Sequence, residues 1–109
     1  IKFDDITPKL YRILKQFRPF GPGNMSPVFA TEEVYDNGNG KKVGKNNEHL
    51  KLSLLEKDNN KKIIQGIAFR QADCYNIIKD KKMFSICYTI EENNFNGNTT
   101  LQLKVKDIR

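Results

Sequence analysis

Alternation of apolar and polar residues at every second position is the feature that most constrains how this chain folds. Three segments show it: His49–Lys57, Met83–Ile90 and Thr99–Ile108. In the first of them, Leu50 and Leu52 fall on one face, while Lys51 and Ser53 fall on the other. A period of two residues is typical of a β-strand with one buried face. We therefore expect a sheet whose apolar side forms the core.

Two further strands are expected from runs that contain β-branched and aromatic residues, Val28–Tyr35 and Lys62–Phe69. The segment Lys41–Lys45 is expected to continue the first strand beyond a turn at Asp36–Gly40, where Asn-Gly pairs tolerate positive φ. The remaining gaps are predicted to be a turn at Asp58–Asn60 and a loop at Asn93–Asn98 with a turn signal at Asn96–Gly97.

Two helical segments are expected around these strands. Thr7 is a good N-cap, and Pro8 suits the first helical position because its missing N–H would be unpaired there. Apolar residues then recur at helical spacing, which predicts a helix over Pro8–Phe17. A second, short helix is predicted over Gln71–Lys79, between the third and fourth strands.

The order of these elements identifies a candidate fold. Three strands, a helix and two strands is the chain order of the OB-fold, a partly open five-stranded barrel. We therefore predict a mainly β, five-stranded OB-fold barrel preceded by a short N-terminal helix. Residues 1–27 are then a lead-in helix with a Pro/Gly-rich connector, and residues 28–109 are the OB-fold domain.

The formal net charge is +6, from 19 basic and 13 acidic residues. This balance favours a polyanionic partner, either nucleic acid or an anionic membrane surface, although charge can also serve solubility alone. No apolar run reaches the about 18–20 residues that cross a bilayer, so no membrane partner is expected. The opening IKFDDITPK lacks the apolar core of a signal peptide and suggests a fragment of a longer protein. Cys74 and Cys87 are expected to be reduced thiols in a cytoplasmic protein.

Candidate catalytic groups are few. The chain has one histidine, His49, which without nearby ligands is most simply a polar surface residue rather than a metal ligand or a base. The acidic pairs Asp4–Asp5 and Glu91–Glu92 come with no partner acid, base or metal ligand. We therefore assign no catalytic residue, no metal ligand and no cofactor to this chain.

Basic residues are concentrated in the middle of the chain. Between Lys41 and Lys62 there are seven lysines against three acidic residues. In an OB-fold, nucleic acid crosses the face of the second and third strands, between the loops that join strands one to two and four to five. Lysines there would neutralise phosphates, and an aromatic ring would stack on a base. The candidate nucleic-acid-binding residues are Lys42, Lys45, His49, Lys51, Arg70, Asn94, Phe95 and Asn96. The alternatives are a solvated face for Lys51 and Arg70 and a barrel-end cap for Phe95.

Four segments together match a known family pattern. They are FGPGNMSPVF (Phe20–Phe29), VGKNNEHLKL (Val43–Leu52), GIAF (Gly66–Phe69) and YTIEENNFNGNTTLQLKVKDIR (Tyr88–Arg109). In this order they resemble the C-terminal OB-fold domain of the RecJ family of single-stranded-DNA-specific exonucleases. The resemblance extends from about Asp5 to Arg109, and it departs at Arg70, where relatives often carry other residues.

The resemblance implies a division of labour. The parent enzyme would be a 5′–3′ exonuclease of DNA repair and recombination, whose DHH core binds Mn²⁺ or Mg²⁺ and lies outside this chain. The chain itself would bind single-stranded DNA and contact the catalytic core of the same polypeptide, with single-strand-binding protein as a further candidate partner. The alternative is a structural domain that braces the core through the helix Pro8–Phe17 and Phe20. An independent enzyme is disfavoured because clustered ligands are lacking.

Overall fold

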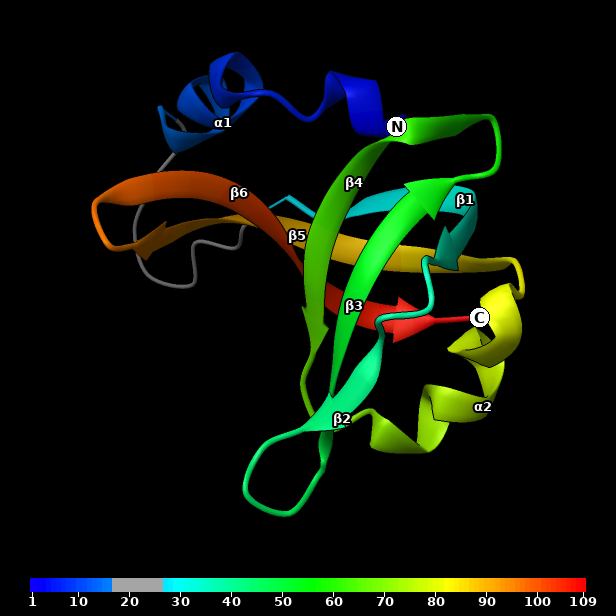
Figure 1. The fold of residues 1–109 in the computed structure, drawn as a ribbon. Coiled ribbons are helices and arrows are strands. Elements are labelled where there is room, and N and C mark those ends of the chain that lie inside the picture. The colour runs from blue at the N-terminus through cyan, green and yellow to red at the C-terminus, as the bar shows by residue number, and fades with distance from the viewer. Residues whose placement is uncertain (17–26) are drawn as a thin grey trace.

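The computed structural model describes residues 1–16 and 27–109, apart from the side chain of Phe95. The connector and Phe20 therefore lie outside the described residues. Six strands form one sheet (Figure 1): β1 (Phe29–Asp36), β2 (Lys41–Val43), β3 (His49–Glu56), β4 (Asn59–Ala68), β5 (Phe84–Phe95) and β6 (Asn98–Ile108). The strand order is β1-β5-β6-β4-β3-β2, and β1 also pairs with β3. That extra pairing closes a ring of five strands, which confirms the predicted mainly β, OB-like architecture.

Strands β1 and β2 together act as the bent first strand of the barrel. β1 pairs with the C-terminal end of β3, and β2 pairs with its N-terminal end. The buried carboxylate of Asp36 holds the bend, since it accepts the backbone N–H groups of Gly38, Gly40 and Ser53 at 2.8–2.9 Å. This confirms that Lys41–Val43 continues the first strand.

The core contains the side chains that the alternation placed inside. Leu50, Leu52 and Leu54 of β3 are fully buried, and so are Tyr88 of β5 and Leu103 of β6. Ile78, the last residue of the second helix, is buried in the core, and so are Phe3 and Ile6 of the N-terminal segment. The apolar sides of the strands therefore face one another across the barrel, as a period of two requires.

The first helix forms where the capping residues predict it. α1 (Pro8–Lys15) follows a short 3-10 turn, η1 (Phe3–Asp5), and Thr7 Oγ1 accepts the Leu10 N–H at 3.1 Å. The second helical segment is less regular than predicted. It is a 3-10 turn, η2 (Ala72–Cys74), one turn of helix, α2 (Tyr75–Ile78), and a further 3-10 turn, η3 (Lys79–Lys81). Positive φ at Asp80 and Lys81 interrupts regular helical geometry there.

Two predicted irregular segments are shorter than expected, because strand extends into each of them. The turn expected at Asn96 and Gly97 is confirmed, but the loop predicted around it is too long, because β5 and β6 stay paired up to that two-residue turn. Both turn residues have positive φ, 50° and 80°, which matches the twist of a tight hairpin. The turn predicted at Asp58–Asn60 is present but lies earlier and is shorter, at residues 57–58, since β4 already begins at Asn59, opposite Glu56. In both hairpins the cross-strand ladder overrides residue types that favour loops.

Candidate nucleic-acid interface

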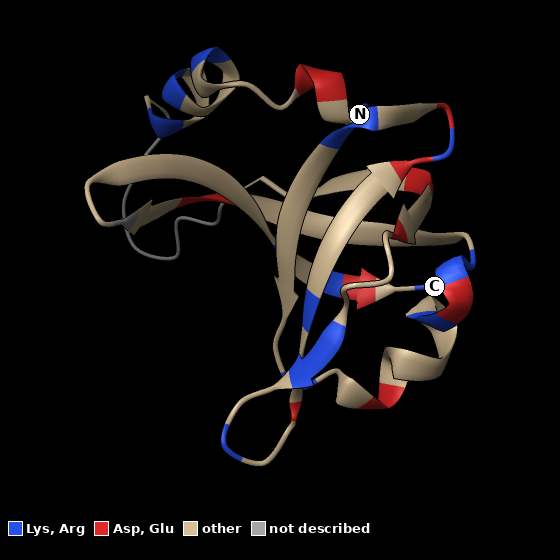
Figure 2. Cartoon of the chain, in the orientation of Figure 1, with Lys and Arg blue, Asp and Glu red and all other residues tan. Residues whose placement is uncertain are grey.

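A row of basic side chains crosses the outer face of the sheet. In the strand pairing, Lys41 lies opposite Lys51, Lys51 lies opposite Ile67, and Ile67 lies opposite Lys104. Residues directly opposite one another point to the same face, and the neighbouring Leu50 points into the core. We call the three lysines of this row, Lys41, Lys51 and Lys104, the basic row. In Figure 2 the blue segments of β2 and β3 lie side by side at one end of the barrel.

An exposed aromatic ring lies beside the basic row. Phe69 follows the last residue of β4 and is 49% exposed. The ring of His49 meets it edge-on, with centroids 5.1 Å apart and an interplanar angle of 78°. Lys104 Nζ lies 5.7 Å from the Phe69 centroid. A half-exposed aromatic ring beside cationic side chains is a group on which an unpaired base can stack.

The sequence interpretation missed Phe69 as a site residue. The signal was present in GIAF, because alternation from the outward-facing Ile67 also directs residue 69 outward. A large aromatic residue in that position has no place in the core.

Hydrogen bonds fix the orientation of His49. Its Nδ1 accepts the backbone N–H of Arg70 at 2.9 Å, so the proton of the neutral ring is on Nε2. Nε2 lies 3.1 Å from Glu48 Oε1 and donates to it. The other Glu48 oxygen accepts the backbone N–H of Asn46 at 2.8 Å. His49 thus ties the β2–β3 loop to the segment that follows β4.

The charge of Glu48 is stabilised within this small network. Backbone N–H groups of Glu48 itself and of Asn46 lower the pKa of its carboxyl below the usual value, with smaller contributions from His49 and Arg70. The Glu48 carbonyl also accepts the Ala72 N–H at 3.2 Å. Glu48 therefore stays ionised as a local counterion and keeps the loop in place.

The structure brings together three of the predicted residues. His49, Lys51 and Arg70 lie at the same end of β3 and β4, and Lys45 is exposed in the adjoining loop. Arg70 has φ 59°, a conformation that favours glycine or asparagine.

Lys42 points away from the basic row. It lies opposite the buried Leu50, and its Nζ is 5.6 Å from the ring of Tyr75, the first residue of α2. Strand pairing thus places Lys42 on the other side of β2 from Lys41.

The remaining predicted residues lie at the β5–β6 hairpin, which Figure 1 shows well apart from the β2–β3 loop. Asn94 Oδ1 accepts the Thr99 hydroxyl at 2.6 Å, and Asn96 forms the turn. The backbone of Phe95 ends β5, and its side chain lies outside the described residues. Nucleic-acid binding by Asn94, Phe95 and Asn96 stays a prediction.

Other chemistry is sparse in the part of the chain that the structure describes. Within residues 1–16 and 27–109, no group of three or more His, Cys, Asp or Glu residues is placed to hold a metal ion. Cys74 and Cys87 are free, and burial raises the pKa of the Cys74 thiol. No helix among the described residues is long and apolar enough to cross a membrane.

The chain is similar to a known family of protein domains. A family model described as the RecJ OB domain matches residues 1–107. A comparison with curated proteins finds no match for the chain. The matched residues include α1 and span all six strands, so the helix and the barrel belong to one family unit.

Proposed function

This chain belongs to the RecJ OB domain family, and from that premise we propose that it binds single-stranded DNA without cutting it. The observation that carries the proposal is the exposed ring of Phe69 between His49 and Lys104, beside the basic row. Its parent would be a RecJ-type 5′–3′ exonuclease of DNA repair and recombination in the cytoplasm. Hydrolysis would come from a core that binds Mn²⁺ or Mg²⁺ and belongs to the same polypeptide.

Two kinds of contact favour a single strand over a duplex. An exposed aromatic ring stacks only on a base that is free of its own neighbours, which a duplex does not offer. Lysines on adjacent strands neutralise successive phosphates without reading sequence. Phe69 supplies the first contact, and Lys41, Lys51 and Lys104 supply the second.

The bracing alternative has less support from α1. Leu10, Tyr11 and Leu14 pack against the domain's own core, and among the described apolar residues of this helix Pro8 and Ile13 are exposed. Little apolar surface of α1 is therefore left for a catalytic core. Single-strand-binding protein remains a candidate partner, with no specific contact to argue from.

Titration of a labelled oligo-dT with the chain, followed by fluorescence anisotropy across a salt series, tests the proposal. If Lys41, Lys45, Lys51, Lys104 and Arg70 each contact a phosphate, log K should fall with log [salt] at a slope of about −3.5. A matched duplex should bind more weakly at every salt concentration. Absence of binding at low salt, or equal binding of the duplex, would overturn the proposal.

A further inference from the structure

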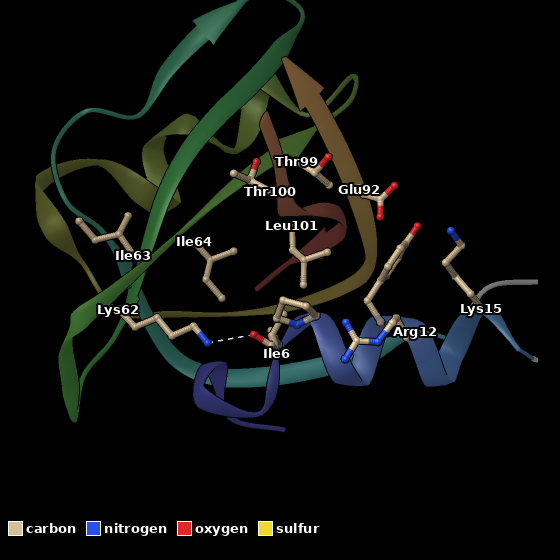
Figure 3. A pocket seen from close by; sticks show the side chains of 12 residues that line it. Ile6, Arg12, Lys15, Lys62, Ile63, Ile64, Glu92, Thr99, Thr100 and Leu101 are labelled. Atoms are coloured by element: carbon tan, nitrogen blue, oxygen red, sulfur yellow. Dashed lines mark hydrogen bonds between the residues drawn. The ribbon is translucent and has the colours of Figure 1, made fainter. Parts of the chain in front are cut away.

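Strands β4 and β6 separate at one end of the barrel. Their parallel pairing consists of Gly66 with Leu103 and Ile67 with Lys104. Before these positions, no pairing in the described chain joins the two strands, so each turns an unpaired edge toward the other. A pocket of about 730 Å³ lies between these edges and α1 (Figure 3).

The pocket combines an apolar interior with a basic rim. Its strand side carries Ile63, Ile64 and Leu101, as Figure 3 shows. Ile63 is half exposed, although nothing in its strand position requires an apolar side chain there. The charged residues of the lining are Arg12, Lys15, Lys62 and Glu92, so basic residues outnumber acidic ones.

The cations on α1 are not neutralised. On α1, Lys15 Nζ lies 5.7 Å from the Tyr11 ring. Lys62, on β4 opposite the helix, donates from Nζ to the Ile6 carbonyl at 2.9 Å. Within the described residues, no carboxylate forms an ion pair with Arg12 or Lys15. The helix therefore presents positive charge to whatever enters the pocket.

We propose that this pocket binds an extended peptide of a partner protein in which acidic and apolar residues alternate. Unpaired strand edges provide backbone donors and acceptors for an added strand. Alternate side chains of such a strand point in opposite directions. Its apolar side chains would contact Ile64 and Leu101, and its acidic side chains would meet Arg12 and Lys15 on α1.

The peptide site is separate from the candidate DNA-binding face. None of the basic row, Phe69 or His49 lines the pocket. Both ligands can therefore bind at once, and the peptide proposal stands whether or not the face binds DNA.

A fluorescein-labelled ten-residue peptide of alternating Asp and Leu is the probe. We expect saturable anisotropy with the chain, and at least tenfold weaker binding by Arg12→Glu. Lys9→Glu is the matched control, because it makes the same charge change on an exposed position of α1 outside the pocket. Ile63→Asp should also weaken binding, and circular dichroism checks that each variant is folded.

Four results would overturn the proposal. The first is equal loss of affinity in Arg12→Glu and Lys9→Glu, which would indicate only general charge attraction. The second is equal binding of an alternating Lys-Leu peptide. The third is displacement of the peptide by oligo-dT, which would place the pocket on the nucleic-acid path. The fourth is self-association of the chain that Arg12→Glu abolishes, which would make a second copy the occupant.

Discussion

At the scale of single residues, Phe69 is the most informative position. Replacing it by leucine keeps an apolar side chain but removes the flat π-face. We expect oligo-dT affinity to fall by roughly fivefold to a hundredfold, which corresponds to the about 1–3 kcal/mol of one stacked base. Met83→Leu is the control, because Met83 is also 49% exposed and lies outside the basic row. Unchanged affinity in Phe69→Leu would mean that no base stacks there.

Tyr88 gives a prediction for stability at high pH. Its side chain is fully buried, and burial raises the pKa of its phenol to about 12, with smaller effects from Glu56 and Asp5 and an opposing hydrogen bond to Thr31. The phenol of the unfolded chain titrates near pH 10. The folded state therefore holds the proton more tightly, and its stabilisation is complete below pH 10 and lost as pH rises toward 12.

We expect about 2–3 kcal/mol of stability to disappear across that pH window through Tyr88. Tyr88→Phe should lose this part of the pH dependence and cost about 1 kcal/mol at pH 8 through the lost hydrogen bond. Urea denaturation at pH 8 and at pH 11, where about half of that loss is expected, measures both effects. A phenylalanine variant with the same alkaline loss as the parent chain would assign the loss to other groups.

At the scale of elements, the bend between β1 and β2 depends on Gly40. A Cβ atom there would lie 2.7 Å from the Asp36 carboxylate, which is 3% exposed and already accepts three backbone N–H groups. Gly40→Ala should therefore destabilise the chain by about 1–3 kcal/mol, because it displaces a buried hydrogen-bonded carboxylate. Urea denaturation measures the loss, and Asn39→Ala in the same turn is the control. Equal stability of the two variants would show that the bend can relax.

Some of these strands could be predicted from the sequence, and some of their features could not. Alternation predicted β3, β5 and β6 because burial of one face is a local pattern. It did not predict that β5 continues through Asn93 to the Asn96–Gly97 turn, because that extension depends on pairing with β6. Likewise, the opposite orientations of Lys41 and Lys42 follow from pairing with β3, which composition does not encode. Residue type thus located the basic region, and strand pairing selected its exposed face.

At the scale of the whole molecule, charge is distributed over distinct surfaces, and the salt dependence of binding separates their roles. A lysine that contacts phosphate releases about 0.7 of a counterion from a single strand, whereas a distant lysine acts only through weak screened attraction. Lys51→Ala and Lys45→Ala should therefore weaken oligo-dT binding about equally for all sequences. Each should also reduce the magnitude of the log K against log [salt] slope by about 0.7.

Lys9→Ala on α1 makes the same charge change outside the basic row and the β2–β3 loop, so it should leave that slope unchanged. Anisotropy titrations at four or more salt concentrations give the slopes directly. If Lys9→Ala lowers the slope as much as Lys51→Ala, the net charge of +6 rather than the basic row attracts the strand. If Lys45→Ala has no effect while Lys51→Ala does, the strand crosses β3 without touching the β2–β3 loop.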